Sequence, residues 1–240
     1  MRRLLFIGVM LFASHLFAGS TDSIEAILRT EGRTTRRVDA LLHMGFATYE
    51  SPAGENTAYW REAQELSEEL RYEFGRVHAP MEGVMADFRA QRYDAVVAQL
   101  KAMIARLDEL GVDQGFYSPL GFIRNTFNAS GDQAARAAYF SEALKRYAGG
   151  GRPRSLAVTH HAMAGYYSTI RQYGSAVEHY MKARDLFRTS SPADVPNETM
   201  VIGWAYERWG NPQRAIPYLH EALREFEAIG DSSMHAEILS

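Results

Sequence analysis

Histidine is the residue through which this sequence could most directly carry chemistry, because the chain has eight histidines and no cysteine. Two metal ligands on one helix must stand three or four residues apart to share a face. No two histidines have that spacing, and the adjacent His160 and His161 would point about 100° apart around a helix. The sequence therefore predicts no metal site and no cofactor, with the histidines at surfaces or interfaces.

The other patterns that could support catalysis have ordinary structural explanations. The Gly-rich, basic stretch at 147–155 lacks the arrangement of a phosphate-binding loop, and no strand is expected before it. Ser175 in "YGSAV" lies at the start of a predicted helix instead of a nucleophile elbow. Acidic stretches such as "EAQELSEEL" are typical of solvated helix faces. We therefore expect no enzyme; the catalytic alternative is one that uses the region of His160 and His161.

Residues 1–18 have the layout of a signal peptide. Arg2 and Arg3 precede an uncharged run from Leu4 to Phe17, and Ala18 offers a small residue at the cleavage position. The alternative is an uncleaved N-terminal anchor, although the run is short beside the span of about 20 residues that a membrane helix needs. The expected localisation is the periplasm, after export across the inner membrane.

The net charge limits the kinds of partner, and the lack of cysteine limits how the fold can be stabilised. Without Arg2 and Arg3 the chain keeps 24 basic and 29 acidic residues. A mildly acidic chain is a poor ligand for nucleic acid, which needs clustered Lys and Arg. With no disulfides available, an exported protein of this kind must be held together by packing. The sequence therefore predicts no nucleic-acid partner.

Five segments of the chain repeat one apolar pattern at an offset of 39 or 40 residues. The aligned residues stand at positions i, i+3 and i+7, on one face of a helix, and in three of the segments they are a large, a small and a large residue. A constant offset of this kind indicates a repeat architecture. The five triplets are Trp60, Ala63 and Ser67; Leu100, Met103 and Leu107; Phe140, Ala143 and Tyr147; Tyr180, Ala183 and Phe187; and Leu219, Ala222 and Phe226.

Another helical stretch precedes each of these segments and ends in a short polar turn. Three of the turns are "NASGD" at 128–132, "IRQYG" at 170–174 and "RWGNP" at 208–212. Each unit is then a helical hairpin whose two helices cannot cover their own apolar face. Stacking the hairpins covers that face, which gives a solenoid.

The spacing of this pattern resembles that of the tetratricopeptide repeat (TPR). The matching residues are Gly203, Tyr206, Gly210, Ala215, Leu219 and Ala222, and Ala164, Tyr167, Tyr173, Ala176, Tyr180 and Ala183 repeat them less perfectly. Arg136 departs from the pattern at a place where the family has a small residue. The resemblance implies an all-α, right-handed α-solenoid of about five TPR-like hairpins with a period of about 40 residues, in one domain from 19 to 240.

In TPR proteins the first helix of each hairpin lines a concave groove, so the resemblance implies partner-binding residues on these helices. Asn can donate and accept hydrogen bonds toward a peptide backbone, Arg can bind a carboxylate, and aromatic residues beside Arg are favoured at interfaces. The alternative for Phe88, Phe122 and Trp204 is that they fill seams between hairpins. The candidates are Met85, Phe88 and Arg89; Phe122, Asn125 and Asn128; His161 and Ser168; and Trp204, Glu207 and Arg208.

The start of the mature chain is similar to extracytoplasmic TPR sensor regions of bacterial histidine kinases and related signalling proteins. The similar stretches are "TDSIEAILRTEGRTTRRVDALLHMGFATYE" and "AQELSEEL". The resemblance implies a non-catalytic module whose partner is a protein or peptide of the cell envelope, or a second copy of the chain. The alternative function is a scaffold or adaptor of an envelope assembly.

The end of the chain carries a further expectation. A new first helix is predicted from about Ser233, and no polar capping helix follows it before Ser240. We therefore expect the repeat domain to continue beyond Ser240. In that case the protein would reach the membrane only through its signal peptide or through a downstream segment.

Overall fold

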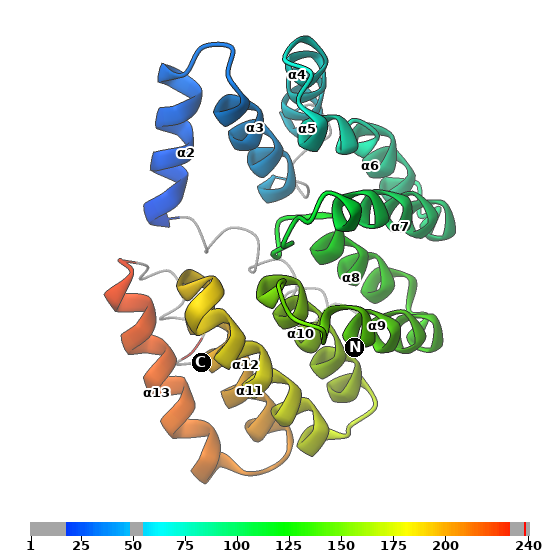
Figure 1. Cartoon of the computed structure of the whole chain (residues 1–240). Coiled ribbons are helices and arrows are strands. Elements are labelled where there is room, and N and C mark those ends of the chain that lie inside the picture. The colour runs from blue at the N-terminus through cyan, green and yellow to red at the C-terminus, as the bar shows by residue number, and fades with distance from the viewer. Residues whose placement is uncertain (1–17, 49–54, 231–237, 239–240) are drawn as a thin grey trace. The chain divides into compact units, whose positions relative to one another are not determined.

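The computed structural model describes residues 18–48, 55–230 and 238, and every regular element in these ranges is a helix (Figure 1). The predicted all-α class is therefore confirmed for the described part of the chain. The chain divides into two compact units, unit 1 with residues 1–112 and 116–131 and unit 2 with residues 113–115 and 132–240. Apart from Ala18, the predicted signal peptide lies outside the described residues, as does the segment from 231 onward apart from Ile238.

Unit 1 begins with hairpin-like pairs of neighbouring helices. It contains α2 (Ala18–Thr30), α3 (Thr35–Ala47), α4 (Glu55–Glu69), α5 (Glu73–Val77), α6 (Met81–Arg89), α7 (Tyr93–Glu109) and α8 (Pro119–Ser130). Helix α3 packs against α4, α6 packs against α7, and α8 packs against α7. The short helix α5 contacts α3, α4 and α7, and the repeat pattern did not predict it.

Unit 2 is a run of helices in which each contacts the next along the chain (Figure 1). It contains α9 (Gln133–Tyr147), α10 (Pro153–Thr169), α11 (Tyr173–Ser190), the 3-10 turn η1 (Pro192–Asp194), α12 (Val195–Arg208) and α13 (Pro212–Ala228). Helices α10 and α11 form one antiparallel hairpin, and α12 and α13 form another. Helices α8 and α9, which were expected to form a hairpin, belong to different units.

The repeated triplets all lie on helices, and they form the packed faces of those helices. They stand on α4, α7, α9, α11 and α13, and all their members are buried except Leu219, which is half-buried. Leu219 lies against Gly203 of α12, where an added Cβ would come within 2.6 Å of the Leu219 Cδ2 atom. The predicted register of the five helices is therefore confirmed.

Local sequence signals set the ends of the hairpin helices. The Asn211 side chain accepts a hydrogen bond from the backbone N–H of Arg214 at 3.3 Å, and Pro212 follows as the first residue of α13. Gly210 ends the preceding turn with φ of 76°, a conformation that favours glycine. Pro217 lies inside α13, and the helix continues through it.

The departure of Arg136 from the TPR pattern is compensated on the neighbouring helix. Its buried guanidinium donates a hydrogen bond at 2.8 Å to the carbonyl oxygen of Ala162 on α10. A Cβ added to Gly165 on α10 would lie 2.5 Å from the same guanidinium. Gly165, one turn after Ala162, has no side chain and so leaves room on α10 for the Arg136 guanidinium. The small residue of this contact therefore lies on α10 instead of α9.

His78 is buried in unit 1, contrary to the expectation that the histidines lie at surfaces. Its ring contacts the rings of Phe74 and Phe46, with centroids 4.8 and 6.0 Å away, and its Nδ1 bonds to the carbonyl oxygen of Phe74 at 2.8 Å. Burial lowers the pKa of His78 to about 4, against the opposing effect of that hydrogen bond. The folded unit therefore holds a neutral imidazole.

The stability of unit 1 should fall in mild acid because of His78. Between pH 6.5 and 4 the His78 side chain binds a proton in the unfolded chain but not in the folded unit. The contribution of His78 to the free energy of unfolding is therefore complete above pH 6.5 and is lost as the pH falls toward 4. We expect a loss of about 2 kcal/mol between pH 7.5 and pH 5. Urea unfolding at both pH values should show it, and His78→Gln should reduce the difference. His220→Gln, at an exposed position, should leave it unchanged; an equal pH dependence in the His78 variant would contradict the assignment.

Candidate functional site

The groove candidates of unit 1 divide into core and surface residues. Met85 and Phe122 are buried, and Phe122 contacts Phe46 and Phe88 with ring centroids 6.5 and 5.1 Å away. Phe88 is half-buried between Phe122 and Tyr93. The interpretation as a seam is therefore correct for Phe122, and the groove interpretation of Met85 and Phe122 is wrong because packing removes both side chains from the surface.

The polar candidates of unit 1 lie nearer to solvent. Arg89 is exposed in the last turn of α6, and Asn125 and Asn128 are half-buried on α8. The Asn125 side-chain oxygen accepts hydrogen bonds from the guanidinium of Arg124, at 2.8 and 3.2 Å. That guanidinium also lies 5.3 Å above the ring of Phe116. Asn125 is therefore oriented by Arg124, with its amide NH₂ as the group that could reach a partner.

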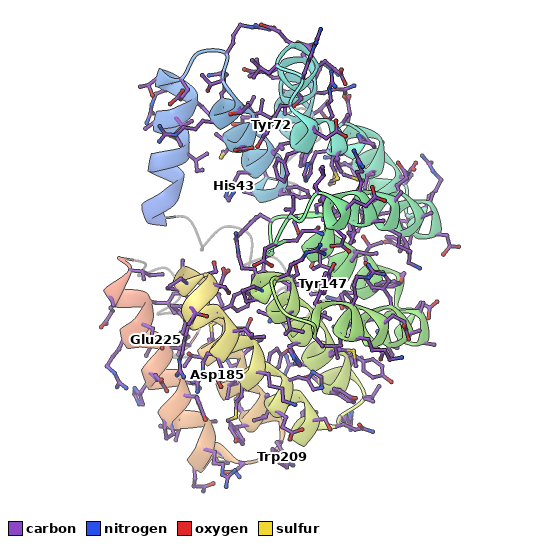
Figure 2. The ribbon with its side chains drawn as sticks, in the orientation of Figure 1. His43, Tyr72, Tyr147, Asp185, Trp209 and Glu225 are labelled. Carbon is purple, nitrogen blue, oxygen red and sulfur yellow. The ribbon has the colours of Figure 1, made fainter. Side chains whose placement is uncertain are left out.

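In unit 2, the last turns of α12 present an aromatic and charged strip. Trp204 is half-buried, and Glu207 and Arg208 are exposed, three and four residues further along the same helix face. Trp209 ends the helix and is 50% exposed (Figure 2). We call these four residues the α12 strip. Ser168, the remaining candidate, is half-buried in the last turn of α10.

Packing beneath the α12 strip holds Trp209 in place. Its ring stacks on the buried ring of Tyr206, with centroids 6.0 Å apart and planes 8° apart, and Tyr218 of α13 stacks on Tyr206 at 5.6 Å. The Trp209 ring also lies against Gly174 of α11, where an added Cβ would be 3.4 Å from it. Trp209 is therefore a partly exposed aromatic group on a rigid support, a feature that suits an interface anchor.

His161 does not present its ring to a partner, which corrects the prediction for this residue. The side chain is buried, and its Nδ1 bonds to Oε1 of Glu198 on α12 at 2.6 Å. Glu198 is fully buried, and the Tyr180 ring covers His161 with centroids 5.3 Å apart. The pair joins α10 to α12, and so it acts in packing the two hairpins.

Asp194 adds another buried carboxyl group near the start of α12. Burial raises its pKa to about 6, and Glu198 adds to that rise, while a hydrogen bond from Ser191 and the charge of Arg154 oppose it. Since the folded-state pKa lies above the unfolded value of 3.8, this contribution to stability is complete below pH 3.8 and is lost as the pH rises through 6. Asp194 and His78 therefore respond to pH with opposite signs.

Segment 113–115 belongs to unit 2 because it caps α10. The Asp113 carboxylate accepts hydrogen bonds from the backbone N–H groups of Arg154 and Ser155, at 3.0 and 2.8 Å. The Ser155 hydroxyl in turn accepts the backbone N–H of Gln114 at 2.8 Å. A carboxylate at this position also complements the positive end of the helix dipole. The cap fixes the start of the helix that carries His160 and His161.

His160 and His161 belong to different surroundings, so they do not form one site. His160 faces His179 of α11, with the two Nδ1 atoms 3.0 Å apart, whereas His161 bonds to Glu198. Within the described residues no cluster of three or more His, Asp or Glu side chains could hold a metal ion. The two adjacent histidines therefore make their contacts separately, His160 with α11 and His161 with α12.

Sequence reasoning missed Glu198 as the partner of His161 and His179 as the partner of His160. Glu198 follows Asn197 in the otherwise apolar stretch "DVPNETMVIGW", and charged residues at fully buried positions are rare unless they are paired. A charged residue beside apolar neighbours could therefore have indicated that Glu198 is buried and paired. The signal for His179 was absent, because a spacing rule for one helix cannot detect a pair formed across a hairpin.

Comparison with known proteins identifies a fold and no family. No family model and no curated protein matches this chain. Among solved structures, the crystal structure of BtubC (BKLC) from P. vanneervenii is similar, with a TM-score of 0.53 and 16% sequence identity, over 89% of this chain and 90% of that chain. At this identity the likeness concerns the arrangement of helices alone. None of the described helices is both long and apolar enough to span a membrane.

Proposed function

We propose that this chain is a non-catalytic, extracytoplasmic interaction module that binds a protein or peptide of the cell envelope. The observation that carries the proposal is the α12 strip. While the first half of α12 is buried, its last turns leave Glu207, Arg208 and Trp209 exposed and Trp204 half-exposed. This combination of aromatic groups and an arginine on a packed helix is favoured at protein interfaces.

The repeated hairpins support the wider form of the proposal, a right-handed TPR-like solenoid. Hairpins α3–α4, α6–α7, α10–α11 and α12–α13 each pair a first helix with a helix that carries a buried triplet. The likeness to BtubC covers most of both chains, which is consistent with a common helical arrangement. Solenoids bind partners along surfaces lined by one set of helices, and the α12 strip lies on a first helix.

The chemistry of the α12 strip favours a particular kind of segment. Arg208 can bind a carboxylate through two parallel hydrogen bonds, and Trp204 and Trp209 offer apolar contact. Glu207 beside Arg208 disfavours a strongly acidic ligand. The expected partner segment therefore combines an apolar or aromatic residue with a single acidic group, either a side chain or a free C-terminus.

Within this proposal we favour a sensor role, because the start of the mature chain resembles TPR sensor regions. It requires the coding sequence to continue beyond Ser240 into a membrane helix and an output domain. Reading that sequence would test it directly. A stop codon at this position would favour the scaffold or adaptor function and would leave the binding proposal intact.

Selection from a random peptide library displayed on phage would test the binding function. A selected peptide should bind the wild-type protein, and Arg208→Ala should weaken its binding at least about tenfold, equivalent to about 1.4 kcal/mol. Arg188→Ala is the matched control, because Arg188 is an exposed arginine on α11 that pairs with Asp185. Asp185 is labelled in Figure 2. Failure to select any peptide, or equal losses in both variants, would contradict the proposed site.

A further inference from the structure

Two histidines from different helices face one another in the α10–α11 hairpin of unit 2. The Nδ1 atoms of His160 and His179 are 3.0 Å apart, and their ring centroids are 5.0 Å apart. Tyr167 also packs against His179, with ring centroids 5.3 Å apart, so both contacts restrict the His179 ring. Both histidines are half-buried, and solvent therefore still reaches the pair.

We propose that His160 and His179 form a binding site for a divalent late transition-metal ion, with Cu(II) preferred. In the metal-free protein one Nδ1 carries a proton and donates a hydrogen bond to the other Nδ1. An ion would displace the proton from the donor Nδ1, and the same ring would take up a proton from solvent on Nε2, so that both rings would then carry hydrogen on Nε2 and coordinate through Nδ1. Neutral imidazole is a common ligand of zinc, copper and nickel. The inference does not depend on the α12 strip.

The spacing of the two nitrogens selects the geometry of the ion. With metal–nitrogen distances of about 2.05 Å, two atoms 3.0 Å apart subtend an angle of about 94° at the metal. That angle matches neighbouring positions of a square-planar or octahedral ion, and it is narrower than the tetrahedral angle of about 109° that structural zinc prefers. Square-planar nitrogen and oxygen ligation is typical of Cu(II) and Ni(II), and Cu(II) binds more tightly in the general order of affinities.

Burial is the main reason why both rings are available as neutral ligands at neutral pH. Burial lowers the pKa of His160 to about 4, with smaller contributions from His179 and Lys182. Burial and Lys182 also lower the pKa of His179, and Glu178 opposes them. Above about pH 6.5 the rings are therefore neutral, and an ion has to displace only the proton that lies between the two Nδ1 atoms. Since the described chain offers no third protein ligand, water would complete the coordination.

Titration of the purified protein with Cu(II), without a histidine tag, tests the proposal. We expect one Cu(II) per chain, with an electron paramagnetic resonance spectrum that shows coupling to two imidazole nitrogens. Ni(II) and Zn(II) should bind at least about tenfold more weakly. Bound Cu(II) should also raise the midpoint of thermal unfolding of unit 2, because it links α10 to α11 and binds the folded state alone.

Variants separate this site from adventitious binding by other histidines or by the terminal amine. His160→Gln and His179→Gln should each weaken Cu(II) binding at least about tenfold, whereas His220→Gln, at an exposed position on α13, should leave it unchanged. Circular dichroism would verify that the variants fold. If a variant failed to fold, the count of coupled nitrogens in the wild-type protein would still decide the question. Wild-type spectra without two coupled imidazoles, or unchanged affinity in folded variants, would overturn the proposal.

Discussion

Replacing Gly121 with alanine should destabilise unit 1 by about 3 kcal/mol, the upper end of the usual cost of overpacking. Gly121 lies in the first turn of α8, where its backbone N–H donates a hydrogen bond to the Ser118 hydroxyl at 3.3 Å. A Cβ there would overlap the carbonyl oxygen of Phe116 and lie 2.6 Å from its carbonyl carbon. Because the obstacle is backbone, a change of side-chain rotamer cannot relieve it. The start of α8 or the loop before it must move.

Urea unfolding followed by the fluorescence of Trp60 would measure this effect, with Trp204 and Trp209 changed to phenylalanine so that the signal comes from unit 1. Gly83→Ala is the matched control. Gly83 lies exposed within α6, and an added Cβ meets nothing within 4 Å. The control should gain about 0.5 to 1 kcal/mol from the better helix propensity of alanine. A loss below 1 kcal/mol for the Gly121 variant would show that the loop before α8 is not packed against it as described.

The sequence predicted the fold well where one pattern recurs. Tyr180, Ala183 and Phe187 are buried as their spacing requires, and so are the aligned residues of four other helices except Leu219, which is half-buried. The periodicity could not predict α5, which is a single short helix inserted between two repeats. Nor could it predict the division between α8 and α9, because the pattern describes each helix by itself and does not say which neighbouring helices pack into one unit.

The candidate site was predictable only in part. A family pattern predicts which residues share one face of a helix, but it does not predict which side chains from other helices pack against that face. Glu207 and Arg208 are exposed, as a surface role requires. His161 is the failure: its partner, Glu198, stands 37 residues away on the next hairpin. A pattern for the repeat assigns both residues to first helices, but it contains no information on which pairs of side chains meet.

Loss of the hydrogen bond between His161 and Glu198 should destabilise unit 2 strongly. His161→Ala is expected to lower the free energy of unfolding of unit 2 by about 3 to 5 kcal/mol, because it removes a hydrogen bond to the fully buried Glu198 side chain and leaves a cavity. Unfolding followed by Trp204 and Trp209 in a Trp60→Phe background would measure it. The exposed His220 again provides the control, since His220→Ala should change stability by less than about 0.5 kcal/mol.

Replacing both members of the pair by apolar residues tests why the single change is costly. A buried hydrogen-bonded pair can often be exchanged for hydrophobic side chains of similar shape with little loss, because neither polar group is then left without a hydrogen bond. The double variant His161→Leu, Glu198→Met should therefore be more stable than His161→Ala. If its loss instead equalled or exceeded the loss in His161→Ala, Glu198 would contribute through contacts other than the one with His161, and the pair could not be regarded as the main link between α10 and α12.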